Sequence, residues 1–274
     1  MSMTVLIAIA SSLLSLAVIL ILVYLLVLVR PSKKTAPDAA LLRDYAHRGL
    51  HGKDVPENSL NAFELACRAG YGIELDVQLS RDGEVMVFHD YSLLRMTGCD
   101  KQLSELDAEE LSSLALNGSD QTVPTFRQVL DLVGGRVPIL VELKGENTDV
   151  SLCERVAELL REYKGLYCLE SFNPLLIGGM KKLFPDAFCG LLYTNVCRDK
   201  KKRSTLNLLL TAMALNLLAK PDFIAYNQED RASLPVRITT GLYGAPKVTW
   251  TVKTKEELDT AHKNGELAIF EDLF

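Results

Sequence analysis

Charged side chains are missing from the first 29 residues of this 274-residue chain. Between Met1 and Val29 there is no Asp, Glu, Lys or Arg, and Leu, Ile, Val and Ala dominate. About 20 apolar residues in a helix cross the hydrocarbon core of a bilayer, so this segment is long enough to span one. A cleaved signal peptide would have a basic start and a short apolar core ending in small residues, and both are absent. We therefore expect a retained transmembrane helix over residues 1–29.

Basic residues are absent before this helix but follow it closely, at Arg30, Lys33, Lys34 and Arg43. Lys and Arg next to a membrane span favour the cytoplasmic side. The sequence therefore predicts a single-pass membrane protein whose C-terminal domain lies on the cytoplasmic face.

The chain also lacks CxxC motifs, a net positive charge and internal repeats. The six cysteines lack the CxxC spacing of metal sites, and several lie in apolar runs, which favours buried thiols in a reducing compartment. A net charge of −5 gives no electrostatic support for a nucleic-acid partner. With no repeat or low-complexity tract, residues 42–274 are enough for one sizeable domain. Residues 30–41, which contain two prolines, are expected to be a short exposed linker.

Within this domain, short strand-like runs alternate with amphipathic helix-like runs. The expected strands are Asp44–His47, Gly72–Val77, Val137–Glu142, Leu166–Glu170, Ala187–Leu192, Phe223–Tyr226, Lys247–Thr251 and Leu267–Phe270. The expected helices are Ser59–Ala69, Thr125–Val133, Ser151–Tyr163, Pro174–Leu183, Leu206–Leu218 and Lys255–Asn264. Regular alternation predicts a parallel sheet covered by helices. Eight strands in this length favour a closed (β/α)8 TIM-type barrel over an open sheet.

One strand-like run, Val85–Phe88, does not fit the repeat because only seven residues separate it from Val77. A parallel crossover needs about a dozen residues or more, whereas Asp82-Gly83 is a hairpin-turn pair. We therefore expect a hairpin at the barrel rim. Residues 92–121 then form a rim excursion with a helix near Ser104–Leu114.

Charged side chains gather where the expected strands end, at the barrel face that carries active sites. Glu74 and Asp76 lie two residues apart in one strand, so they share a face and point into the barrel. Their apolar neighbours Ile73, Leu75 and Val77 point to the helix layer. Two buried carboxylates are costly without a compensating cation.

Glu142 adds a third inward carboxylate, which predicts an all-oxygen site suited to Mg²⁺ or Ca²⁺. Arg48 and Lys144 beside it would suit a phosphate. His47 and His89, at the same rim, would supply an acid and a base near neutral pH. The set predicts metal-assisted phosphoryl chemistry.

Each of these features alone has a structural alternative. An E-x-D pair is more often a salt-bridged structural pair, and a histidine at a strand end is more often a satisfied rim residue. Their joint placement at one rim favours the catalytic interpretation. His51 and His262 do not belong to this set at the rim. We therefore expect His51 in a loop and His262 on a surface helix.

The order of motifs resembles the glycerophosphodiester phosphodiesterase family from about Tyr45 to the C-terminus. The motifs are His47-Arg48-Gly49, Pro56-Glu57-Asn58-Ser59, Glu74-Leu75-Asp76-Val77, Asp82-Gly83, His89-Asp90, Glu142-Leu143-Lys144, Ser171-Phe172-Asn173-Pro174 and Trp250-Thr251-Val252. The resemblance implies a TIM-type barrel that hydrolyses glycerophosphodiesters to sn-glycerol 3-phosphate and an alcohol.

The resemblance also implies a role for each motif residue. Glu74, Asp76 and Glu142 would hold Ca²⁺ or Mg²⁺, and His47 and His89 would be the acid–base pair. The residues implied in substrate binding are Arg48 and Lys144 on phosphate, Glu57 in support of the metal or its ligands, and Trp250 and Phe172 in the glycerol or leaving-group pocket. Two matters stay open: which histidine is the acid, and whether water or the neighbouring glycerol hydroxyl attacks first, the latter giving a cyclic phosphate.

The sequence departs from the family pattern at its end. It reads GELAIFED over 265–272, where many relatives have a GVDGIITD-like strand. The apolar strand survives but the terminal Thr-Asp does not, so no contribution of the last strand to the pocket is predicted. Glu170, before Ser171, is likewise given no role.

Three alternative functions are considered for such a barrel. The first is a phospholipase D-like activity on lysophospholipids, for which an exposed Leu206–Leu218 near the pocket would speak; otherwise that run is a barrel helix packed on the sheet. The second is a membrane-tethered barrel that binds a ligand without turnover, which loss of a metal ligand or histidine would indicate. The third is a phosphoinositide-type lyase, which would not carry the HRG and ELK motifs together.

Overall fold

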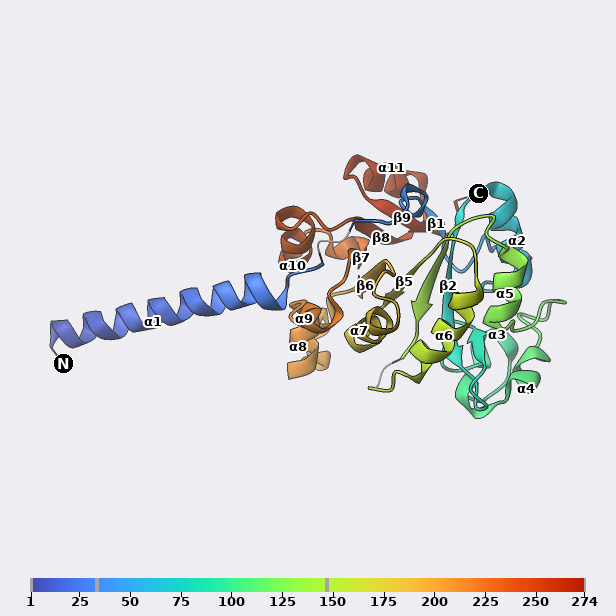
Figure 1. Ribbon diagram of the computed structural model, residues 1–274, viewed down its shortest axis with the longest axis horizontal. Coiled ribbons are helices and arrows are strands. Elements are labelled where there is room, and N and C mark those ends of the chain that lie inside the picture. The colour runs from blue at the N-terminus through green and yellow to red at the C-terminus, as the bar shows by residue number, and fades with distance from the viewer. Residues whose placement is uncertain (1, 33–34, 146–147, 274) are drawn as a thin grey trace.

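A computed structural model describes residues 2–32, 35–145 and 148–273 of the chain. Its first element is α1 (Met3–Val23), which one π-helical turn, η1 (Tyr24–Leu28), extends. None of residues 3–23 is buried, and α1 projects from the rest of the molecule (Figure 1). Residues 3–28 form the one helix in the described chain that is long and apolar enough to cross a membrane.

The remainder is a closed barrel of eight parallel strands. They are β1 (Tyr45–Ala46), β2 (Gly72–Leu79), β4 (Ile139–Leu143), β5 (Tyr167–Ser171), β6 (Cys189–Tyr193), β7 (Phe223–Asn227), β8 (Lys247–Val252) and β9 (Leu267–Phe270). Each pairs with its neighbour in order, and β1 pairs with both β2 and β9, which closes the ring. The expected TIM-type barrel and its eight strands are confirmed.

The expected hairpin is also confirmed. β3 (Val85–Val87) runs antiparallel to β2, with Val77 opposite Val87, and Gly83 turns the chain at φ +82°. The excursion that follows holds α3 (Leu94–Thr97), η3 (Leu103–Glu105) and α4 (Ala108–Ser112) around a small apolar core of its own. The helix expected near 104–114 is therefore split. Leu106 is extended, and a capping box between Asp107 and Glu110 starts a new helix after it.

Helices cover the outside of the barrel. Those with the expected positions are α2 (Leu60–Ala69), α5 (Phe126–Val133), α6 (Ser151–Glu162), α7 (Pro174–Leu183) and α11 (Lys255–Lys263). Ser59, Thr125 and Thr254 cap the first turns of α2, α5 and α11 with their hydroxyls. The connection from β7 to β8 contains η6 (Gln228–Asp230), α10 (Leu234–Arg237) and η7 (Ile238–Leu242).

The single helix expected over Leu206–Leu218 was wrong. After β6 the chain forms η4 (Val196–Arg198), η5 (Lys200–Lys202), α8 (Thr205–Thr211) and α9 (Asn216–Ala219). Met213 has φ +50°, a conformation that a continuous α-helix cannot contain, so α8 ends before it.

The end of the long N-terminal helix packs on these elements. The Tyr24 hydroxyl donates to the Ala212 carbonyl (3.0 Å), and the Asn216 amide donates to the Val29 carbonyl (2.8 Å). The expected linker is exposed at 37–40, but Val29 and Leu41 at its two ends are buried against the barrel. Apolar side chains at those ends explain the difference. Lys33 and Lys34 lie outside the described residues.

Strand alternation sorts the barrel residues as expected. Ile73, Leu75 and Val77 are fully buried in the core beneath the helices. A second apolar cluster, which includes Leu41, Tyr45, Leu140 and Phe223, fills the barrel at the end where the strands begin. The inward-pointing polar residues therefore lie at the opposite end of the barrel, toward the C-terminal ends of the strands.

Candidate active site

Three carboxylates lie side by side inside the barrel where β2 and β4 end. Glu74 and Asp76 come from β2 and Glu142 from β4, and they are 2%, 0% and 7% exposed. One oxygen of each lies within 4.8 Å of one oxygen of the other two. An oxygen-only set of this density is the donor chemistry of Mg²⁺ or Ca²⁺, so these residues fit such a cation.

Strand register extends this row of acids. Asp76 is paired with Glu142, and Glu142 with Glu170 on β5. Glu170 is 1% exposed, and its Oε2 has no hydrogen-bond partner within the described chain. Glu170, for which no role was predicted, lines the same pocket.

Burial and crowding set the protonation of the acids. Burial, together with the neighbouring carboxylates Asp76 and Glu142, raises the pKa of Glu74 well above its usual value. Burial also raises the pKa of Glu142, to about 7, although Lys144 opposes it. Burial acts in the same direction on Asp76, but Lys144, His89 and Arg48 outweigh it and lower the pKa of that carboxyl. The cluster is therefore poised to exchange protons for a cation.

Two cations partly compensate the acids. The Lys144 ammonium lies 3.0 Å from Asp76 Oδ1 and 2.9 Å from Glu142 Oε1. The Arg48 guanidinium lies 3.7 Å from Asp76 Oδ2, which also accepts a 2.8 Å hydrogen bond from Asn58. Both cations stand where a phosphate oxygen near the carboxylates would meet them.

The turn after β1 places Arg48. Arg48 has φ +55°, and its backbone N–H donates to Glu74 Oε2 (2.9 Å). Gly49 follows at φ +81°, and a Cβ there would lie 2.8 Å from the Cβ of Ala62 in α2. Only glycine fits this turn against α2, which explains the glycine of the HRG motif.

Glu57 does not line the pocket. Its Oε1 accepts from Arg48 (2.7 Å) and from Arg95 of the rim excursion (2.6 Å). Burial opposes its ionisation, but the two guanidinium groups prevail and lower its pKa. Glu57 therefore holds Arg48 in place. Its implied role in support of the metal or its ligands stays a prediction.

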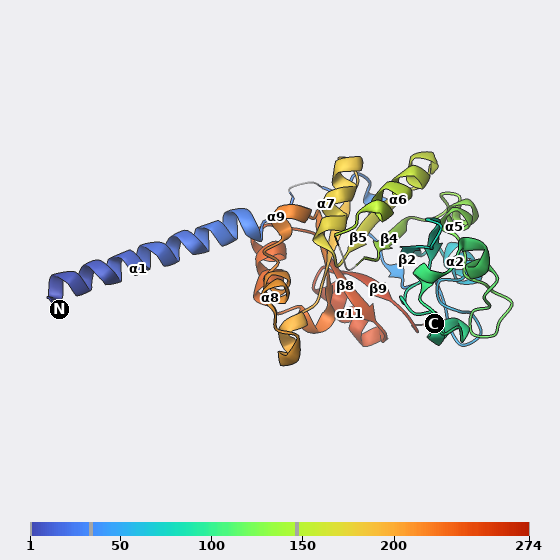
Figure 2. The same ribbon diagram turned by 90° about the horizontal axis from the view of Figure 1, so that it is seen from below.

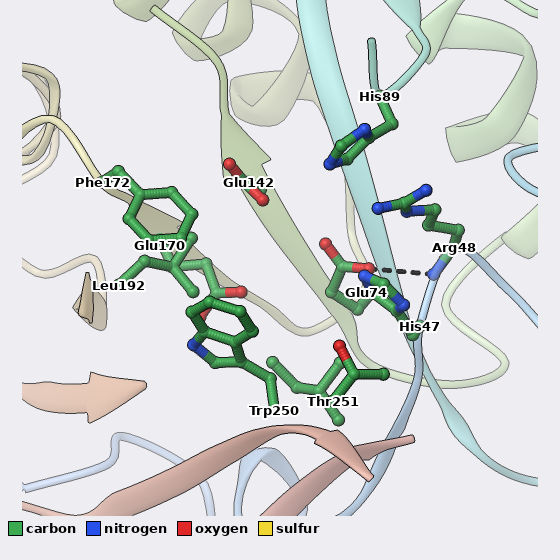
Figure 3. Close-up of a pocket in the computed structure, with 11 residues that line it drawn as sticks. His47, Arg48, Glu74, His89, Glu142, Glu170, Phe172, Leu192, Trp250 and Thr251 are labelled. Carbon is green, nitrogen blue, oxygen red and sulfur yellow. Dashed lines mark hydrogen bonds between the residues drawn. The ribbon is translucent and has the colours of Figure 1, made fainter. Parts of the chain in front are cut away.

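His47 and His89 both line the pocket, together with Arg48 and the carboxylates Glu74 and Glu142 (Figure 3). Nδ1 of His89 lies 2.6 Å from Asp90 Oδ1, which Arg95 anchors in turn. Nδ1 of His47 lies 2.5 Å from Glu271 Oε2. With Nδ1 of each ring engaged by a carboxylate, Nε2 is the atom free for chemistry. Burial lowers the pKa of both imidazoles, against the opposing pull of nearby carboxylates.

The pocket between them encloses about 100 Å³. One wall is polar, and the other consists of Leu192, Ile269 and the rings of Phe172 and Trp250, whose centroids lie 5.6 Å apart edge to face. A neighbouring pocket of about 360 Å³ shares His89, Glu142 and Phe172 with it and adds Lys144. Polar groups therefore face one part of a ligand and apolar groups another.

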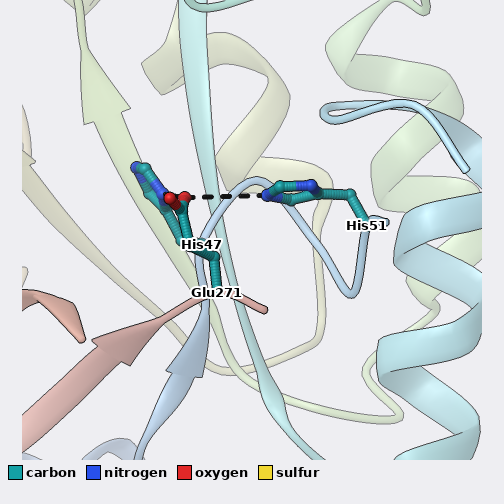
Figure 4. Close-up of side chains that lie close together, drawn as sticks. All are labelled: His47, His51 and Glu271. Atoms are coloured by element: carbon teal, nitrogen blue, oxygen red, sulfur yellow. Dashed lines mark hydrogen bonds and ion pairs between the residues drawn. The ribbon is translucent and has the colours of Figure 1, made fainter. Parts of the chain in front are cut away.

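Sequence reasoning missed Glu271 and Asp90 as partners of the two histidines. It also wrongly expected that His51 has no charged neighbour. Glu271 directly follows β9, and its carboxylate lies between His47 and His51 (Figure 4). His51 Nε2 lies 3.7 Å from Glu271 Oε2, so His51 is not the isolated loop residue that was expected. The last strand does contribute to the site, through Glu271 directly after it. Asp90 was the other omission. His262, as expected, lies on a surface helix and contacts Asp44.

His47, His51 and Glu271 also offer one possible metal ligand each within 4.8 Å. Lys253 Nζ lies 2.5 Å from the other oxygen of Glu271, which places a cation there already. We therefore interpret Glu271 as the hydrogen-bond partner that orients His47, with His51 and Lys253 as charge partners of the same carboxylate. Glu271 has a pKa well below its usual value, chiefly because both histidines and Lys253 bond to it.

Residues 47–273 match the model of the glycerophosphoryl diester phosphodiesterase family. A glycerophosphodiester phosphodiesterase of Caldanaerobacter subterraneus is 32% identical over 54% of this chain and 65% of its own length. One from Bacillus altitudinis is 37% identical over 56% of this chain and 66% of its own. These matches span just under two thirds of each relative.

A lysophospholipase D, GDPD1 of Rattus norvegicus, is 31% identical over 45% of this chain and 42% of its own length. Among solved structures, a phosphodiesterase from Oleispira antarctica bound to sn-glycerol-3-phosphate superposes with a TM-score of 0.68 at 23% identity, covering 84% of this chain and 92% of that one. The likeness in structure concerns the barrel fold.

Proposed function

Since the chain belongs to the glycerophosphoryl diester phosphodiesterase family, we propose that it hydrolyses glycerophosphodiesters to sn-glycerol 3-phosphate and an alcohol. The observation that carries the proposal is the pair of carboxylate-backed histidines that share one pocket with a buried acidic cluster. A barrel that only binds a ligand would not need this pair.

In the proposed reaction, one histidine accepts the proton of the attacking hydroxyl through Nε2. The bond between phosphorus and the alcohol oxygen breaks, and the other histidine donates a proton to that oxygen. The attacking group is water, or first the neighbouring glycerol hydroxyl, in which case water opens the cyclic phosphate in a second step. Glu271 and Asp90 hold the two rings and stabilise their imidazolium forms.

We propose that Glu74, Asp76 and Glu142 hold Mg²⁺ or Ca²⁺. When bound, such a cation supplies charge that stabilises the phosphate oxygens in the transition state. Arg48 and Lys144 add donors on the same side. Phe172 and Trp250 would contact the carbon skeleton of glycerol or the leaving alcohol.

A second candidate is lysophospholipase D-like hydrolysis of lysolipids. Two observations favour it: the apolar N-terminal helix, and the exposed leucines of α8, for example Leu206 (58% exposed) and Leu208 (55% exposed). We propose that α1 with η1 is retained as a single transmembrane span with the barrel on the cytoplasmic face. A barrel tethered in this way stays within reach of lipid headgroups.

A substrate panel tests both functions. Full-length protein in detergent would receive glycerophosphocholine, glycerophosphoethanolamine, glycerophosphoglycerol and lysophosphatidylcholine, each with Mg²⁺ and with Ca²⁺. Release of glycerol 3-phosphate from the first three supports the main proposal, and release of lysophosphatidic acid from the last supports the second. A His47→Ala preparation controls for contaminating enzymes. Absence of both products with both metals would contradict the two proposals.

The orientation has a test of its own. Cys67 and Cys99 are partly exposed, whereas the other four cysteines are buried. A membrane-impermeant thiol reagent should label these two positions only after cells are permeabilised. Rapid labelling in intact cells would place the barrel outside.

A further inference from the structure

Exposed leucines gather on the side of the barrel from which α1 emerges. Leu206, Leu208 and Leu209 of α8 are 58%, 55% and 40% exposed, and Leu234 of α10 and Leu242 of η7 are 66% and 64% exposed. We call these five residues the leucine face. On α9, Leu217 and Leu218 are also exposed (42% and 49%). On the other described elements of the barrel, exposed leucines are isolated, as at Leu42 and Leu94. An exposed apolar patch of this kind indicates a surface that binds a protein or a membrane.

The leucine face adjoins the end of the membrane helix. The Tyr24 hydroxyl bonds to Ala212, which follows α8, and the Tyr243 hydroxyl, which follows η7, donates to the Leu25 carbonyl (2.5 Å). Both views of the molecule show α8 and α9 beside the point where α1 leaves the barrel (Figures 1 and 2). The helix leaves from the side of the barrel and not from either end of the strands. With α1 across a bilayer, this side would rest on the lipid surface.

Four consecutive cations stand directly before α8. Lys200, Lys201, Lys202 and Arg203 are all exposed, and no carboxylate in the described part of the chain forms an ion pair with them. A cluster of this size next to a membrane helix suits anionic lipid headgroups. Leucines with a basic border are the pattern of a surface that lies in a membrane interface.

We propose that the leucine face and the basic run 200–203 form a second membrane contact, which seats the side of the barrel on an anionic leaflet. The inference rests on the proposal that α1 spans the membrane. The run 196–203 continues from the end of β6, the strand end at which the pocket lies. Seating this side on lipid therefore brings the rim of the pocket close to the bilayer surface.

Hydrogen exchange tests the contact without relying on turnover. Full-length protein would be placed, one copy per disc, in nanodiscs of phosphatidylcholine alone and of phosphatidylcholine with phosphatidylserine. Amides of residues 200–212 and 234–243 should exchange at least about threefold more slowly in the anionic discs. Amides of α2 should be unaffected.

Two variants separate the contact from general effects. Leu206→Ser with Leu208→Ser, and Lys200→Gln with Lys201→Gln and Lys202→Gln, should each remove the added protection. The matched control is Leu94→Ser with Lys101→Gln. These positions belong to α3 and the loop after it, on the far side of the barrel from α1 (Figure 1), so this variant should retain the added protection. Equal exchange in both lipids would overturn the proposal. So would protection that appears only with two copies per disc, which would assign the face to self-association. The phosphodiesterase proposal can fail in its own assay without affecting either result.

Discussion

The carboxylate of Glu271 lies 2.5 Å from Nδ1 of His47, although 224 residues separate the two in the chain. Closure of the barrel brings them together, because β1 and β9 are neighbours and each residue directly follows its strand. The contact directs the other ring nitrogen of His47 into the pocket.

Replacing Glu271 by Gln should lower the pKa of His47 further, because the carboxylate stabilises the imidazolium form. The limb of the pH–rate profile that reports His47 should move to lower pH, and kcat should fall about 10- to 100-fold. Glu256→Gln, on the exposed face of α11, is the matched control. An unchanged profile would show that Glu271 has no positioning role.

Replacing either histidine by Ala should reduce turnover by about 100- to 10,000-fold, the range typical of acid–base catalysis. His47 and His89 are polar side chains that line the pocket and are not part of the hydrophobic clusters, so the circular dichroism spectrum should not change. His262→Ala, on a surface helix, should retain full activity. Near-normal turnover by His47→Ala or His89→Ala would remove that residue from the acid–base assignment.

Cation binding should weaken as pH falls through about 7. The raised pKa of Glu142, about 7, means that a proton must leave for a cation to bind. Below that pH, Mg²⁺ affinity should drop about tenfold per pH unit for each proton that the cation displaces. Titration calorimetry at pH 6, 7 and 8, in buffers of different ionisation enthalpy, measures both affinity and proton release. Equal affinity at pH 6 and 8 would contradict this, and turnover that chelator does not affect would exclude a metal requirement.

Lys144→Met should destabilise the metal-free protein. Lys144 is the ammonium that compensates the buried Asp76 and Glu142, and removing one partner of a buried ion pair costs about 3–5 kcal/mol. The melting temperature measured in EDTA should fall, and Mg²⁺ should restore much of the loss because the cation replaces the missing charge. Lys263→Met, exposed on α11, is the control. A loss that Mg²⁺ does not reverse would argue against cation binding at these acids.

Local patterns in the sequence were enough to predict the strands, the hairpin and the inward acids. Alternation within β2 places Glu74 and Asp76 on one face, and a strand of fixed period leaves no other arrangement. The Asp82-Gly83 pair likewise determines a turn by its own backbone preferences. These features depend on residues a few positions apart, so no knowledge of distant segments is needed.

The helix over 206–218 shows where local reasoning failed. Its run of leucines reads as one helix, but the elements at the end of α1 pack against it and the chain breaks at Met213. Exposure of Leu206 and Leu208 could not be read from composition, because apolarity alone does not distinguish a core face from a surface that meets lipid.

The sequence by itself determined the barrel. It also identified two histidines as candidates for catalysis and predicted that the three acids lie at one site. Only the tertiary structure decided what stands behind each of these groups. Glu271 and His51 join His47 because the ring closes between the first and last strands. Glu57 binds both Arg48 and Arg95 because the rim excursion folds back over the first turn. Such partners are hundreds or tens of residues apart, and their approach depends on how the whole chain closes in space, which no local pattern encodes.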